Sequence, residues 1–459
     1  MQINSLGRSS DFVNSDADRL RAVIMQTPGS ERRHVVPRFG FISSLGFSSI
    51  LLGEETESQH LGFKNILKKR GVQIIDINDL INNAIFNLKE GGILGEWIEN
   101  NFPLMAAILK ESGEITANDL VGASDRAFYR FNKYGTHNPF AKPLLGMFFV
   151  RDLGVVLPKG VILASFGNKR APESKIARLI FSHACPLSKI PVVFDAEKEG
   201  VLVQGGDLIV YDENTLLMGI DNLSSREAAS LIAKKLNKTV VGVKLTSYNS
   251  FVTGAGGSFA SLFLHLDTCF NLIDKNKSLV VPYFFEKKYA SNNPLLSVMR
   301  GAMPSSSART DRLGLERALR QLIFETNLKN IGSELIKLGE VIEFVSGTGE
   351  QIETDMKLVD YLREELGHKI VYVGGEPPSS FIDQVKHLVE IVIPEVYYQA
   401  ANVFAISPGE VAIYRGNTGE TQKSLRRSGV KVVEFEGSEL ARWNGGPHCM
   451  TLPVIRGGN

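Results

Sequence analysis

Short apolar runs alternate with helical patterns over much of this chain. Residues 21–26 and 72–77 are apolar runs bounded by turn residues or glycine, and both predict buried strands. Residues 59–69, between them, place apolar side chains on one helical face. The chain therefore begins with a predicted strand–helix–strand unit.

The pattern changes after this unit. Apolar residues then recur at helical spacing, with no convincing strand between them: Leu80, Ile81, Ile85, Leu88, Leu94, Ile98, Leu104, Ala107, Ile108 and Leu120. We predict an all-helical insertion over residues 78–141. It separates the first unit, residues 1–77, from the remaining units, residues 142–459.

Strand and helix patterns alternate again after the insertion. Strands are predicted at residues 148–150, 155–165, 192–194, 201–218, 240–245, 341–345, 370–373 and 430–435, with two more within 262–283 and a hairpin over 403–414. Helices are predicted at residues 172–184, 224–236, 311–338, 355–366, 381–389 and 423–427. The alternation predicts a mixed α/β fold, but periodicity does not say how the units assemble.

Composition excludes several classes of protein. The 459 residues are 43% hydrophobic and 22% charged, which is typical of a globular chain. Their formal net charge of +1 provides no long-range field for nucleic acid or anionic membranes, so neither partner is expected. No apolar run approaches the roughly 20 residues of a membrane span. Residues 1–21 are too polar for a secretory signal, so we expect a cytoplasmic protein.

Other simple sites are disfavoured by spacing. Three cysteines provide neither a disulfide framework nor a zinc cluster. The glycine-rich segments at residues 254–258 and 346–349 match neither a dinucleotide fingerprint nor a phosphate loop, and we interpret them as turns.

Two acidic segments follow or interrupt apolar strands. Asp152 ends Phe149-Val-Arg-Asp, and such an acid is more often a cap or part of an ion pair than a catalyst. Gln204-Gly-Gly-Asp207 interrupts a predicted strand. Two glycines there indicate either a close approach to the backbone or an ordinary bulge.

Two further segments carry reactive side chains. His265 and Asp267 share one face at strand spacing, which suits an acid–base pair, half of a metal site or a satisfied buried pair. Cys449 follows a Gly-Gly-Pro-His turn that favours an exposed thiolate, whereas most free cysteines only fill cores. Cys185 and Cys269 lie in more apolar contexts and take the core interpretation.

In this order the four segments resemble the arginine deiminase branch of the guanidino-modifying, or pentein, superfamily. That pattern is an Arg-Asp after a strand, an acid-Gly-Gly-Asp, a His-x-Asp and a C-terminal Gly-Gly-x-x-Cys. Residues 20–29 also look like the first strand of the family. The resemblance implies a five-bladed α/β propeller with its site on the central axis and a helical insertion after the first unit.

The resemblance also implies roles for individual residues. Asp152 and Asp267 would hold the guanidinium, which presents a planar fork of N–H donors to carboxylates. Cys449 would attack its central carbon, while His265 protonates the leaving nitrogen and then activates water. Gln204 would orient His265. The remaining substrate-binding positions carried over are Asp207, Phe149, Arg170 and Gly446. The chemistry requires no metal or other cofactor.

Some positions depart from the family pattern. Gln204 replaces an acid, so the pKa of His265 should be lower than in the family unless Asp207 or another acid substitutes. Gly146, Leu223 and Asn444 stand where the family binds the head of arginine. We therefore expect a small guanidino substrate other than free arginine.

Two other functions stay open at this point. If the chain nitrogen leaves instead of the terminal one, the protein is an amidinotransferase that passes the amidino group to an amine. If Gln204 disables the chemistry, the protein is a guanidino-binding relative. Sequence leaves self-assembly into a homo-oligomer undecided.

Overall fold

The computed structural model describes residues 12–29, 53–127, 143–167, 170–245, 263–299 and 334–457. The turn predicted at residues 254–258 and most of the helix predicted at 311–338 lie outside these ranges.

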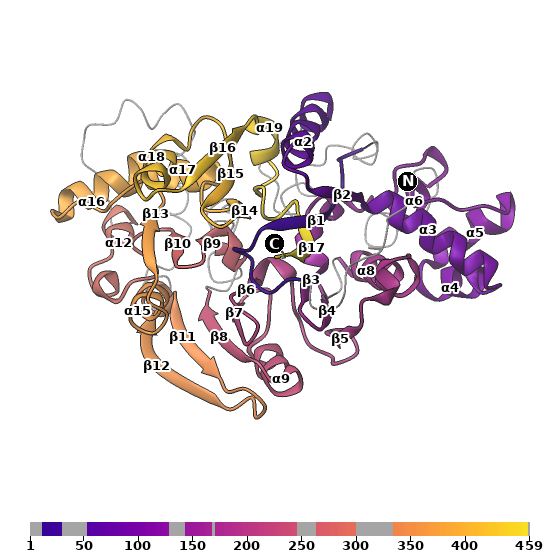
Figure 1. Cartoon of the computed structure of the whole chain (residues 1–459), viewed down its shortest axis with the longest axis horizontal. Coiled ribbons are helices and arrows are strands. Elements are labelled where there is room, and N and C mark those ends of the chain that lie inside the picture. Colours follow the sequence, from indigo (N-terminus) through magenta and orange to yellow (C-terminus); the bar gives the residue numbers. More distant parts are fainter. Residues whose placement is uncertain are drawn as a thin grey trace.

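The described strands form five sheets (Figure 1). Each sheet contains three neighbouring strands, named below in the order first, second and third. In every case the first strand is antiparallel to the second, and the second is parallel to the third. Three of these sheets are β3 (Gly154–Leu157), β4 (Gly160–Leu163) and β5 (Val192–Asp195); β6 (Leu208–Val210), β7 (Thr215–Ile220) and β8 (Thr239–Lys244); and β9 (Phe270–Asp274), β10 (Lys277–Val280) and β13 (Lys369–Tyr372). The other two are β14 (Phe404–Ser407), β15 (Glu410–Tyr414) and β16 (Lys431–Phe435); and β17 (Leu452–Arg456), β1 (Leu20–Met25) and β2 (Gln73–Asp76). The sheet of β8 continues antiparallel through β11 (Glu340–Phe344) and β12 (Gln351–Lys357).

Helices connect the parallel strands, as a parallel pair requires a crossover. These are α2 (Gly53–Lys68), α8 (Ala171–His183), α9 (Arg226–Leu236) and α18 (Gly419–Arg427), with α12 (Pro294–Met299) and α15 (Leu358–Glu364) between β10 and β13. The start of α9 is fixed by Ser225, whose side chain accepts a hydrogen bond from the N–H of Ala228. The mixed α/β class predicted from the sequence is confirmed.

Further helices lie outside these crossovers. The described part of residues 78–141 holds α3 (Ile77–Glu90), α4 (Leu94–Asn101), α5 (Pro103–Ser112) and α6 (Ala117–Leu120), gathered at one side of Figure 1. Their apolar faces share a hydrophobic core with strands β3 to β8, and α3 packs on α8. After β13 come α16 (Phe381–His387), a π-helical turn (Leu388–Val392), α17 (Ile393–Tyr397) and, before the last strand, α19 (Ser438–Ala441).

Three secondary-structure predictions were wrong in detail. Residues 148–150 are not a strand, because the backbone coils into 3-10 turns η4 (Leu145–Phe148) and η5 (Val150–Leu153). The strand predicted over 201–218 is broken by the 3-10 turn η7 (Gly205–Asp207). The helix predicted from residue 355 begins at Leu358, because the residues before it pair with β11 as strand β12. The pairing joins residues that the local pattern cannot relate, so the sequence pattern does not reveal it.

The shared order of the sheets positions the functional side chains. A turn precedes the first strand of each: η5 before β3, η7 before β6, η9 (Leu266–Thr268) before β9, and segments that end at Val403 and Thr451 before β14 and β17. Turn η7 packs against both η5 and η9. Side chains from distant parts of the sequence therefore converge at one place.

Candidate active site

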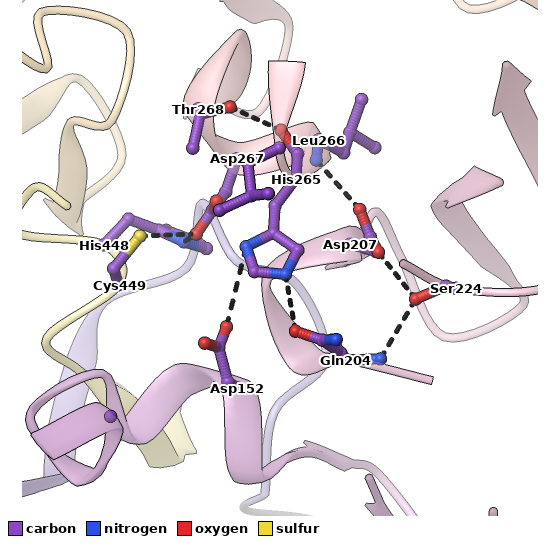
Figure 2. Close-up of polar contacts among 12 residues, drawn as sticks. Asp152, Gln204, Asp207, Ser224, His265, Leu266, Asp267, Thr268, His448 and Cys449 are labelled. Carbon is purple, nitrogen blue, oxygen red and sulfur yellow. Dashed lines mark hydrogen bonds and ion pairs between the residues drawn. The ribbon is translucent and has the colours of Figure 1, made fainter. Parts of the chain in front are cut away.

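The turns before the first strands bring the predicted reactive residues together. Asp152 comes from η5, Gln204 from the segment before η7, His265 and Asp267 from η9 and its N-cap, and Cys449 from the segment before β17 (Figure 2). All five side chains are buried, with at most 6% exposed. A charged group in such a place depends on its neighbours rather than on water.

The two glycines of η7 permit this convergence. A Cβ on Gly205 would collide with the carbonyl oxygen of Arg151. A Cβ on Gly206 would lie 3.0 Å from Asp152 Oδ1 and from the ring of His265. The close approach predicted from the Gly-Gly pair is therefore present.

Cys449 has two side-chain partners. Its Sγ donates to Asp267 Oδ2 at 3.4 Å and accepts from Asn402 Nδ2 at 3.1 Å. Burial raises the pKa of the Cys449 thiol well above its ordinary value, and the charges of Asp267 and Asp152 raise it further. The exposed thiolate expected from the sequence is therefore wrong: Cys449 is buried, and its surroundings favour the neutral thiol.

Asp267 lies beside the thiol. Burial, with help from Asp152, raises the pKa of Asp267 to about 7. Its Oδ2 accepts from His448 Nδ1 at 2.8 Å, and burial together with Arg151 lowers the pKa of His448 well below its ordinary value. Asp267 Oδ1 is buried and has no hydrogen-bond partner among the described residues.

His265 is held by Gln204. Gln204 Oε1 lies 2.8 Å from His265 Nε2, so the bond requires the proton on Nε2. Nδ1 then faces Asp152 Oδ1 at 3.8 Å (Figure 2). Burial lowers the pKa of His265, although Asp152 partly opposes this effect. The cause of this lowering is burial, so the lower pKa expected from Gln204 relative to the family stays a prediction.

Asp152 is paired on one side only. Its Oδ2 accepts from Arg170 Nη1 at 2.7 Å, whereas its Oδ1 is buried without a hydrogen-bond partner among the described residues. Arg170 also bonds Glu173 through Nε and Nη2, at 2.8 and 2.6 Å, and donates to the carbonyl oxygen of Gly146. Burial opposes the charge of Arg170, but Glu173 and Asp152 raise its pKa overall.

The absence of a side chain at Gly146 makes room for this arginine. A Cβ there would collide with Glu173 Oε1 and lie within 2.9 Å of the Arg170 guanidinium. The guanidinium of Arg170 therefore sits among two carboxylates and a carbonyl, and its substrate-binding role stays a prediction.

The other predicted substrate-binding residues lie around the same centre. Asp207 accepts from Ser224 Oγ at 2.6 Å and from the N–H of Leu266 at 3.0 Å, so it supports η9. No hydrogen bond among the described residues joins Asp207 to His265, so none supports it as the substitute acid. The ring of Phe149 fills the space that a side chain on Gly445 would need.

Sequence reasoning assigned no role to three residues at this centre: Asn402, His448 and Glu173. Asn402 directly precedes the predicted hairpin at 403–414, and His448 directly precedes Cys449. A side chain on Gly446, another predicted substrate-binding residue, would collide with Asn402. Position before the first strand of a unit is the signal that could have identified Asn402.

The described residues contain no cluster of metal ligands: no group of three or more His, Cys, Asp or Glu side chains there is arranged to hold a metal ion. No helix there has the length and apolar character needed to cross a membrane.

Comparison with known proteins decides the family. The arginine deiminase family model matches residues 104–349 and 340–456, which together make up most of the chain. The chain belongs to the arginine deiminase family. This membership confirms the resemblance predicted from the four motifs, and with it the class of activity, hydrolysis of a C–N bond in a guanidino group.

Relatives match this family member over nearly their whole length. The arginine deiminase of Metamycoplasma arthritidis (strain 158L3-1) is 23% identical over 97% of this chain and 96% of its own. The arginine deiminase of Streptococcus uberis is 23% identical over 97% of both chains.

Solved structures of similar proteins include larger ones. The N-terminal domain of ArgZ, an arginine dihydrolase from Cyanobacteria, has a TM-score of 0.47 at 13% identity, over 96% of this chain and 98% of that domain. Unliganded AgrE has a TM-score of 0.48 at 13% identity, but the chain spans only 40% of AgrE.

Proposed function

We propose that this protein hydrolyses the guanidino group of arginine or an arginine derivative to a ureido group and ammonia, with Cys449 as nucleophile. One observation carries the proposal. Asp152 and Asp267 lie beside His265 and Cys449 respectively, and each keeps a buried carboxylate oxygen without a partner in the described part of the chain. Unpaired buried carboxylate oxygens are costly unless a donor arrives, and a guanidinium supplies a planar set of donors.

The charge of the substrate activates the site. Without a ligand, burial favours a neutral Cys449, and Asp267 has a pKa of about 7. A guanidinium beside both groups stabilises their ionised forms, because an opposite charge at short distance lowers the pKa of an acid. Entry of the cation therefore generates the thiolate where it is needed, and the thiol proton passes to solvent.

The reaction then proceeds in two halves. The Cys449 thiolate bonds to the guanidino carbon, and His265 gives a proton to one terminal nitrogen, which leaves as ammonia. The enzyme then holds the rest of the substrate as an amidino-thioether on sulfur. Neutral His265 removes a proton from water as its oxygen bonds to the same carbon, and the C–S bond breaks to release the ureido product and the thiolate.

His265 transfers these protons through Nδ1. Its Nε2 is committed to Gln204, whereas Nδ1 faces the Asp152 carboxylate that binds the substrate in this proposal. Gln204 orients the imidazole but adds no negative charge, so a smaller fraction of His265 is protonated at neutral pH than with an acid there.

Recognition of the substrate head differs from that in the family pattern. The positive charge of the Arg170 guanidinium is already paired with the carboxylates of Asp152 and Glu173. Gly146 has no side chain and so leaves space for the guanidinium in this position. We propose that this arginine shapes the guanidino end of the pocket and that an α-carboxylate contributes little to selection. The ion pairs of Arg170 with Asp152 and Glu173 support this proposal.

The arrangement of the sheets supports a finer architecture. We propose that the five sheets are the blades of a propeller whose axis passes through the site, with residues 78–141 as an insertion after the first unit. Repetition of one strand order and the site residue before each first strand support this.

Product analysis tests the proposed function. The purified protein is incubated with arginine, agmatine, substituted arginines and an arginine-containing peptide, each with and without an acceptor amine. We expect a ureido product plus ammonia, with agmatine and arginine turned over within about tenfold of each other. Amidino transfer to the added amine would contradict hydrolysis, and all compounds unchanged would favour a binding protein.

Replacement of Gln204 by glutamate is expected to shift the pH dependence. A carboxylate at this position pairs with imidazolium, so it raises the pKa of His265 by roughly 1–3 units. Since the protonated ring is the acid of the first half-reaction, the falling limb of the rate against pH should move to higher pH. The profile of kcat from pH 5 to 9 measures this shift.

Gln384→Glu makes the same chemical change on α16, outside the site, and should leave the profile in place. If Gln204→Glu left the limb unmoved in a folded protein, His265 would not be the acid.

A further inference from the structure

Asn402 is a fully buried side chain at the centre of the site. It lies two residues before β14, in the segment that precedes the first strand of its sheet, where Asp152, Asp207, Asp267 and Cys449 also lie in theirs. Each of the five sheets therefore contributes a polar or reactive side chain from the segment before its first strand. Asn402 is the contribution of the β14 sheet.

The hydrogen bonds of Asn402 fix the orientation of its amide. Its Oδ1 accepts from the backbone N–H groups of His448 and Cys449, at 3.0 and 3.1 Å. Backbone N–H groups are obligatory donors, so the oxygen must face them and the nitrogen must face the other way. Asn402 Nδ2 then donates to the carbonyl oxygen of Asp267 at 2.8 Å and to Cys449 Sγ at 3.1 Å.

These four bonds connect the nucleophile to its neighbouring acid. Asn402 holds the backbone of the Cys449 segment through one end of its amide and the backbone of η9 through the other. The carbonyl oxygen of Asp267 also accepts from Asn271, which donates in addition to the carbonyl oxygen of Ala401. The amide of Asn402 thus reaches the sulfur from a position that its surroundings fix firmly.

We infer that Asn402 is a positioning residue for Cys449: its amide aims the sulfur at the substrate carbon and supplies the hydrogen bond that holds the thiolate. The thiol proton points to Asp267 Oδ2 and is lost on ionisation, whereas the Asn402 N–H donor remains. A hydrogen bond to the charged form of a group favours that form. The inference rests on the proposed role of Cys449 as nucleophile.

The test separates the donor from the scaffold. Asn402→Asp keeps an oxygen for the two backbone N–H groups but replaces the donor that faces the sulfur. Asn402→Ala removes both the amide oxygen and the N–H donor. Asn293→Ala is the matched control, because Asn293 is also a buried asparagine that bonds two backbone groups, those of Tyr283 and Leu295, but has no hydrogen bond to a residue of the site. All variants carry Cys185→Ser, which removes the exposed thiol.

The measurement is the rate of Cys449 alkylation by iodoacetamide against pH, followed by peptide mass spectrometry. We expect the apparent thiol pKa to rise by at least about one unit in Asn402→Asp and Asn402→Ala and to stay in place in Asn293→Ala. In turnover, kcat should fall at least about tenfold while KM changes less. A folded Asn402→Asp variant with the alkylation profile of the parent protein would overturn the inference.

Two further readouts keep the test decisive. If the Asn402 variants do not fold, the side-chain amide signal of Asn402 in the ¹⁵N-labelled parent protein should shift on alkylation of Cys449, and an unmoved signal would overturn the inference. Alkylation needs no substrate. A shifted thiol titration without turnover of any guanidino compound would therefore contradict the proposed function and support the role of Asn402.

Discussion

Cys449→Ser should lower turnover by on the order of 10⁴-fold or more, since it removes the nucleophile of both half-reactions. A hydroxyl ionises far less readily than a thiol, so no guanidinium at this site will generate the alkoxide. The hydroxyl still donates to Asp267 and accepts from Asn402, as the thiol does. The fold should therefore survive, and ammonia release from the preferred substrate measures the loss.

Cys185→Ser is the matched control for this experiment. Cys185 is exposed, so the core interpretation drawn from the sequence was wrong for this residue. It lies outside the site, and the same chemical change there should leave turnover as it was. A Cys449→Ser protein that melts at the parental temperature and retains more than a few per cent of the activity would remove Cys449 from the mechanism.

Asp267→Asn is expected to separate thiol reactivity from turnover. The carboxylate provides a charged partner for the guanidinium, and such hydrogen bonds contribute about 1.5–3 kcal/mol each. With one or two of them lost, kcat/KM should fall roughly 10- to 10⁴-fold, because each 1.36 kcal/mol is a factor of ten. Steady-state kinetics with the preferred substrate measure the fall.

The thiol should respond in the opposite direction. The negative charge of Asp267 raises the pKa of Cys449, so its removal lowers that pKa and speeds alkylation at neutral pH. Asp274→Asn, on β9 but outside the site, should change neither rate. Alkylation and turnover that both fell in Asp267→Asn would mean that Asp267 only supports the local structure.

The sequence predicted those site residues whose chemistry is local. Asp152, Gln204, His265, Asp267 and Cys449 stand in short motifs, and the structure brings all five together. The two glycines before Asp207 also predicted a close approach of the backbone, because such an approach excludes a side chain. Most strands and helices were predicted from periodicity, which is also a local property of the sequence.

Contacts formed only in the folded chain could not be predicted. Arg170 has the charge to bind a carboxylate, but its spacing does not reveal that the carboxylates are Asp152 and Glu173. Asn402 is an ordinary loop residue until the β14 sheet is seen to follow the order of the others. Residues 355–357, the end of strand β12, were predicted as helix, because pairing with β11 rather than the local pattern determines their conformation.

In the proposed mechanism, Cys449 carries the substrate as a covalent amidino-thioether. Intact-protein mass spectrometry after rapid acid quenching detects this intermediate directly, with peptide mapping to locate the adduct. We expect a mass increase equal to the substrate less ammonia, located on Cys449. An adduct of the amidino group alone would identify a transferase, and product formation with Cys449 unmodified throughout would contradict the mechanism.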